Sequence, residues 1–89
     1  MKPMPGYIMV EVNGLDLSDT EAQTIPGLYS RLIKALDTGK AIMLTGIKNG
    51  DAVVSPIYVT ATLGAGATIV LSGIAAIVTD DDKVTHVNS

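Results

Sequence analysis

The chain has 89 residues, of which 47% are hydrophobic, and its formal net charge is −3. This length allows one domain with a single modest core. The six basic residues are scattered along the chain, which argues against a surface that follows nucleic-acid phosphates. Cys, Phe and Trp are absent, so disulfides and thiolate sites are excluded and the core must be mainly aliphatic.

Residues 1–6 contain two prolines, and we expect them to form an extended arm in front of a single domain at residues 7–89. This N-terminus lacks the apolar core of a signal peptide. The most apolar run, residues 69–78, is far shorter than the roughly 18–20 residues needed to cross a bilayer. We therefore expect a soluble, unexported protein with no membrane partner.

Alternating apolar residues predict a first strand at residues 7–13, followed by a polar loop at residues 14–23. The loop carries Asp16, Asp19 and Glu21, which raises the alternatives of a metal site and an acid/base pair. Their spacing matches neither, so solvated loop carboxylates are favoured.

Residues 24–39 are the only segment with the apolar period of a helix. Thr24 suits the N-cap, Pro26 suits the first turn and Gly39 suits the left-handed closing position. The inward stripe consists of Leu28, Leu32, Ala35 and Leu36, widened by Tyr29 and Ile33.

The rest of the chain reads as strands separated by turns. Strands are predicted at residues 41–47, 52–63, 67–79 with a kink or bulge at Gly73, and 83–87, with turns at 48–51, 64–66 and 80–82. Pro56 cannot donate to a ladder, so its surroundings should lie at an edge or a bulge. The fold class that follows is α+β, with one helix packed on a mainly antiparallel sheet of about five strands in the order β-α-β-β-β-β.

The segments 52–59 and 69–78 are apolar on both faces, whereas one helix shields only one face of a sheet. Surface of that kind is usually covered. Either the sheet folds back into a sandwich or barrel, or the chain forms a homo-oligomer, a dimer or trimer. The interface residues expected for the oligomer are Val54, Tyr58, Val70 and Ile77.

No pattern of catalytic residues is visible. The sole histidine, His86, lies near the chain end, and no Gly-x-Ser-x-Gly sequence is present. Gly64-Ala65-Gly66 precedes a predicted strand instead of the helix that a dinucleotide fingerprint requires. Residues 80–82, three aspartates, fit a solubilising turn better than a calcium loop. We expect no enzyme, no catalytic or metal-binding residue and no cofactor.

The run from Ala35 to Ile47 places a helix end, Gly39-Lys40-Ala41 and an apolar strand in succession; a Thr-rich strand follows at 57–63, and the run 78–85 closes the pattern. This arrangement resembles small phage and prophage proteins of the head-fibre or other virion-associated kind over about residues 26–87. The resemblance implies a structural or accessory role in a virion, repeated copies, contact with other virion proteins, and a location in the virion or host cytoplasm. It carries over no functional residue.

The function expected from the sequence is thus a non-enzymatic structural or interaction module that self-associates. The alternative is a small peptide- or metabolite-binding module, for which a deep pocket lined by Tyr29 and Tyr58 would be the distinguishing feature.

Overall fold

The computed structural model describes residues 6–39 and 41–87. The expected arm at residues 1–6 therefore lies, apart from Gly6, outside the described residues. The elements are β1 (Tyr7–Glu11), β2 (Gln23–Thr24), α1 (Leu28–Thr38), β3 (Ala41–Thr45), β4 (Lys48–Asn49), β5 (Ala52–Val53), β6 (Ile57–Leu63), β7 (Thr68–Ser72), β8 (Ala76–Thr79) and β9 (Lys83–His86).

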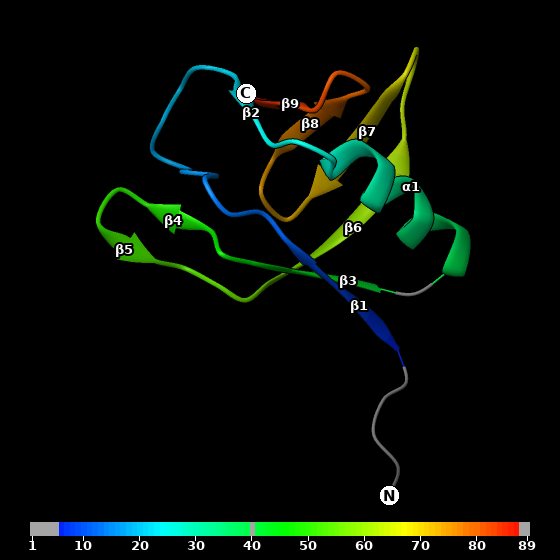
Figure 1. Cartoon of the computed structure of the whole chain (residues 1–89), viewed down its shortest axis with the longest axis horizontal. Coiled ribbons are helices and arrows are strands. Elements are labelled where there is room, and N and C mark those ends of the chain that lie inside the picture. The colour runs from blue at the N-terminus through cyan, green and yellow to red at the C-terminus, as the bar shows by residue number, and fades with distance from the viewer. Residues whose placement is uncertain (1–5, 40, 88–89) are drawn as a thin grey trace, which may run out of the picture.

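Seven strands form one mixed sheet in the order β1-β3-β6-β7-β8-β9-β2, and β4 and β5 form a separate hairpin. β1 and β3 are parallel because α1 connects them, whereas every other neighbouring pair is antiparallel. In Figure 1 the sheet curls around a core with α1 against it, and the β4–β5 hairpin extends away on the left. β1 and β2 are the two edges of the sheet.

The predicted α+β class, with one helix on about five strands, is wrong, because the chain is mostly β. Seven strands spaced by about 4.8 Å would extend over roughly 30 Å if they were flat. The 11-residue helix is only about 16 Å long and contacts β1, β6 and β8. The sheet therefore encloses its core largely by its own twist and curl.

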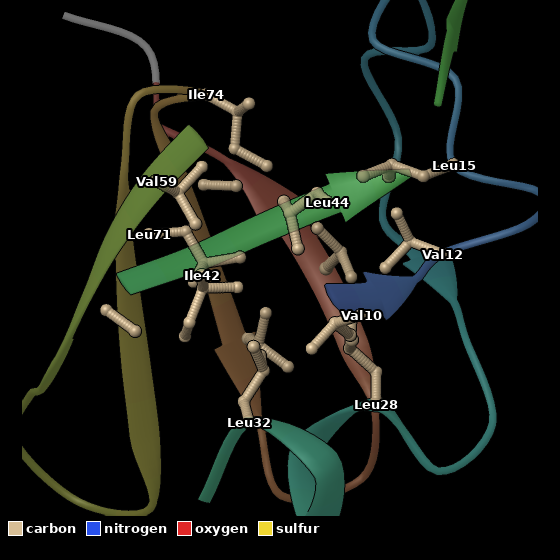
Figure 2. Close-up of a cluster of buried hydrophobic side chains, with 14 of the residues drawn as sticks. Val10, Val12, Leu15, Leu28, Leu32, Ile42, Leu44, Val59, Leu71 and Ile74 are labelled. Atoms are coloured by element: carbon tan, nitrogen blue, oxygen red, sulfur yellow. The ribbon is translucent and has the colours of Figure 1, made fainter. Parts of the chain in front are cut away.

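The core contains residues from strands across the sheet, from Val10 in the edge strand β1 to Val84 in β9, the neighbour of β2. Figure 2 shows Leu28 and Leu32 of α1 pointing toward Ile42 and Leu44 of the sheet. The predicted inward stripe is confirmed for Leu28, Leu32 and Ala35, which are buried, while Leu36 is half-buried.

The helix begins later than the sequence predicts. Gly27, with φ +79°, takes the N-cap position, and Thr24 belongs to β2, where it pairs with Lys83. Pro26 consequently precedes the helix. The predicted end is confirmed, since Gly39 has φ +71° and its N–H donates to the Leu36 carbonyl.

The long strand predicted at residues 52–63 is interrupted. Its first part, β5, pairs with β4 around a turn at Gly50 and Asp51, and its second part, β6, pairs with β3. The break contains Pro56, which has no N–H for a ladder. The chain reverses where the turn was predicted, but the two connecting residues are Gly50, with φ +66°, and Asp51, whereas Lys48 and Asn49 belong to β4 and Asn49 pairs with Ala52.

The kinked strand predicted at residues 67–79 is instead a hairpin. β7 and β8 pair antiparallel, with Leu71 opposite Ala76, so the chain reverses over residues 72–75. Gly73 has φ +116°, and a Cβ there would lie 3.0 Å from the Tyr58 carbonyl oxygen. The glycine thus permits a reversal packed closely against β6.

Candidate functional site

His86 lies at the rim of a hollow of about 260 Å³ whose lining includes Leu17, Asp19, Thr20 and Ile74. Its Nε2 atom is buried and has no hydrogen-bond partner among the described residues. The Asp19 carboxylate accepts the Glu21 N–H. In the described part of the chain, the His86 imidazole has no hydrogen bond to a nucleophile or to an acid that would orient it, so these residues do not form a catalytic triad.

Two of the three aspartates of the β8–β9 turn, Asp81 and Asp82, accept hydrogen bonds through their carboxylates from different partners. The Asp82 carboxylate accepts the N–H groups of Gly27 and Tyr29, at 2.7 and 2.8 Å. The Asp81 carboxylate accepts the Thr79 hydroxyl, and this hydrogen bond is the main cause that lowers its pKa. Asp82 therefore caps α1 from a distant turn. No local sequence pattern predicts this role, because 55 residues separate Asp82 from Gly27.

Asp16 joins the loop at residues 14–23 to the β4–β5 hairpin. Its Oδ1 accepts the N–H of Gly50 at 2.9 Å, and also the N–H and hydroxyl of Ser18. These hydrogen bonds, led by that from Gly50, lower the pKa of Asp16 to about 2. The carboxylate is a charged structural tie and is ionised at neutral pH.

The backbone of the same residue is held by Gln23, whose side chain bonds both the N–H and the carbonyl of Asp16 at 2.9 Å. Asp16 is thus tied to the β4–β5 hairpin, whereas Asp19 and Glu21 are exposed loop residues, with the Asp19 carboxylate bonded to the Glu21 N–H. Among residues 6–39 and 41–87 no group of three or more His, Asp and Glu side chains is placed to hold a metal ion.

An apolar patch lies on the outer face of β1, β3 and β6. We define the outer patch as Tyr7, Met9, Met43 and Tyr58. Met9 is opposite Met43 and Met43 is opposite Tyr58, so their side chains share one face. The rings of Tyr7 and Tyr58 meet edge to face, with centroids 5.7 Å apart.

The exposure of the outer patch distinguishes it from the rest of the surface. Met9 is 62% exposed, Tyr58 58% and Tyr7 45%, whereas Met43 between them is buried. The other large apolar side chains that are exposed in the described part of the chain are Val53 on β5, Leu63 at the far end of β6 and Val87 after β9. The outer patch is therefore a local concentration of exposed apolar and aromatic surface.

The four expected interface residues divide between two environments. Tyr58 belongs to the outer patch. Val70 and Ile77 oppose each other on the same outer face, in β7 and β8, and both are half-buried. Val54 instead packs against the core, and its N–H donates to the Ile47 carbonyl. Sequence reasoning missed Tyr7 and Met9, although their positions in the alternating first strand predicted that they face away from the core.

The peptide- or metabolite-binding alternative requires a deep pocket lined by both Tyr29 and Tyr58, and these two residues do not line a common pocket. Tyr29 is half-buried on α1 and packs against the core, while Tyr58 lies on the outer face of β6. The sheet separates them.

Within the described residues, no helix has the length and apolar character needed to cross a membrane. Comparison of the chain with protein-family models, with curated proteins and with solved structures gave no match.

Proposed function

We propose that this chain is a non-enzymatic structural or interaction module that self-associates as a dimer or trimer through the outer patch. The observation that carries the proposal is the gathering of three strongly exposed side chains, Tyr7 and Met9 on β1 and Tyr58 on β6, on either side of Met43 in β3. Aromatic residues and Met are enriched in the cores of protein interfaces. Stacking two such faces would remove the patch from water.

The surroundings of the patch support the same use. Thr60 and Thr62 follow Tyr58 on the outer face of β6 and are exposed, which provides a polar rim beside an apolar centre. Val70 and Ile77 lie further along this face, so the interface that we propose is centred on Tyr58 and can extend toward them.

The setting that we propose is a phage or prophage virion, as a head-fibre or accessory protein. Its support is the resemblance of residues 26–87 to virion-associated proteins, which implies repeated copies. Detection of the chain in purified particles, by mass spectrometry of virions from a strain that carries the gene, tests this setting. Its absence from particles whose other structural proteins are detected would contradict it.

Self-association is tested by light scattering at micromolar protein concentration. The expected mass is two or three times the 9.2 kDa of one chain. Tyr58→Asp should give monomers, because an interface would bury an unpaired carboxylate. Val53→Asp is the matched control, since Val53 is 78% exposed and lies outside the patch. A monomeric unmodified protein, or a Tyr58→Asp variant that stays associated, would refute the proposal.

A further inference from the structure

A groove separates the free edge of β1 from α1. One hollow of about 230 Å³ has the side chains of Ile8, Val10 and Ala35 in its lining, with Met9 on the strand side and Arg31 and Lys34 on the helix side. A second hollow, of about 260 Å³, lies beyond Arg31 and is lined by Glu11, Asn13 and residues before the helix. The lining of the first hollow is mainly apolar, and both hollows share Arg31.

The backbone of β1 can accept another strand along this groove. The Ala41 N–H donates to the Gly6 carbonyl and the Val12 N–H donates to the Thr45 carbonyl, so the even-numbered residues of β1 bond to β3. Because bonding alternates along a parallel ladder, Tyr7, Met9 and Glu11 direct their backbone groups to the other side. No other strand in the described part of the chain pairs with that edge.

Two cations border the groove of this acidic protein. The Arg31 guanidinium donates to the carbonyl oxygens of Glu11, Pro26 and Gly27, which are neutral acceptors. Its bond to Glu11, at 2.6 Å, places the positive charge at the free edge of β1. Lys34 is exposed on the next turn of α1. The Glu11 carbonyl is thus already bonded, and the groove offers apolar side chains, the edge backbone groups of Tyr7 and Met9, and positive charge together.

This charge argues against a second copy of the chain as the occupant. Pairing β1 with its own symmetry mate would place two α1 helices on the same face of the joined sheet, with Arg31 and Lys34 of each facing the other. Such like-charge juxtaposition disfavours the pairing. An acidic segment has the complementary charge.

We propose that β1 binds an extended, acidic peptide segment of a partner protein as an added edge strand in the groove beside α1. Main-chain hydrogen bonds from the edge of β1 supply affinity, as in other cases of strand addition. The acidic side chains of the segment, on the face of the joined sheet that α1 covers, approach Arg31 and Lys34, and the alternate apolar side chains lie on the opposite face beside Tyr7 and Met9. This inference does not require the self-association proposed for the outer patch, although Met9 borders both surfaces.

The charge preference is tested with three fluorescein-labelled peptides in which Val alternates with Glu, Gln or Lys. Fluorescence anisotropy with the full chain at low ionic strength should rank their affinities Glu, then Gln, then Lys, with added salt weakening the first. Lys34→Glu should weaken binding of the Glu peptide about tenfold and strengthen binding of the Lys peptide. Lys48→Glu, on the exposed β4 hairpin, makes the same change of net charge and should preserve the ranking.

The edge geometry is tested at Met9, whose N–H faces away from β3. Met9→Pro removes that donor without removing a bond to β3, so it should abolish peptide binding, whereas Met9→Thr keeps the donor and should bind. Equal binding of the three peptides, no binding of the Glu peptide at millimolar concentration, or equal binding by both Met9 variants would overturn the proposal. Self-association that Met9→Pro abolishes and Tyr58→Asp leaves intact would assign the edge to a second copy instead.

Discussion

The cap that Asp82 provides for α1 gives the most direct test of how this fold is held together. Its carboxylate accepts two N–H groups at the start of the helix, from Gly27 and Tyr29. Asp82 itself has φ +67°, a left-handed conformation that Asn and Gly tolerate best. Asp82→Asn therefore keeps the backbone and one acceptor oxygen, and Asp82→Ala removes both acceptors in a backbone that disfavours Ala.

The expected magnitudes follow from this geometry. Loss of an N-cap side chain costs about 0.5–2 kcal/mol, and hydrogen bonds to a charged group contribute about 1.5–3 kcal/mol. We expect Asp82→Asn to lower the free energy of unfolding by about 1 kcal/mol and Asp82→Ala to lower it by about 2–3 kcal/mol. Asp82→Gly should fall between them because it removes the carboxylate without the backbone strain.

Urea denaturation followed by circular dichroism, at one fixed protein concentration, measures these differences. Asp80→Asn is the control, because Asp80 lies in the same turn and is exposed, and the described hydrogen bond that it makes comes from its backbone N–H. Thr24→Ala removes the cap that the sequence predicted and should change stability by less than about 0.5 kcal/mol. Equal unfolding free energies for Asp82→Asn and Asp80→Asn, or a larger loss for Thr24→Ala, would refute this account.

Two further predictions concern the loop tie and the core. The pKa of Asp16 is lowered from 3.8 to about 2 by its hydrogen bonds, so its ionised form stabilises the fold above about pH 4 and this contribution is lost as the pH falls toward 2. Acid titration of urea midpoints should show that loss in the unmodified protein and a flatter curve in Asp16→Asn; parallel curves would contradict it. Leu32→Ala should cost about 2–5 kcal/mol because Leu32 is fully buried, and Lys34→Ala should be nearly neutral. Similar urea midpoints for Leu32→Ala and Lys34→Ala would show that the wrong face of α1 is assigned to the core.

Local sequence was sufficient where neighbouring residues determine the structure. The apolar stripe of α1 and the glycine at its end follow from a period of 3.6 and from the freedom of Gly39 at positive φ. The reversal at Gly50 and the outward direction of Tyr58 likewise follow from the freedom of glycine at positive φ and from alternation along a strand. Each of these features depends on residues only a few positions apart.

Tertiary structure decided the features that join distant segments. The start of α1 depends on Asp82, which arrives from a turn 55 residues later and replaces the local cap at Thr24. A glycine at position 73 permits either a kink within one strand or a reversal between two strands. The structure has the reversal, and β6 packs closely against Gly73 there. The outer patch and the groove exist only because α1 returns the chain so that β3 lies between β1 and β6. Sequence alternation indicated which face most strand residues take, although not that Val54 packs against the core, and the pairing of distant strands determined which faces meet, because such pairing depends on the energy of the whole core.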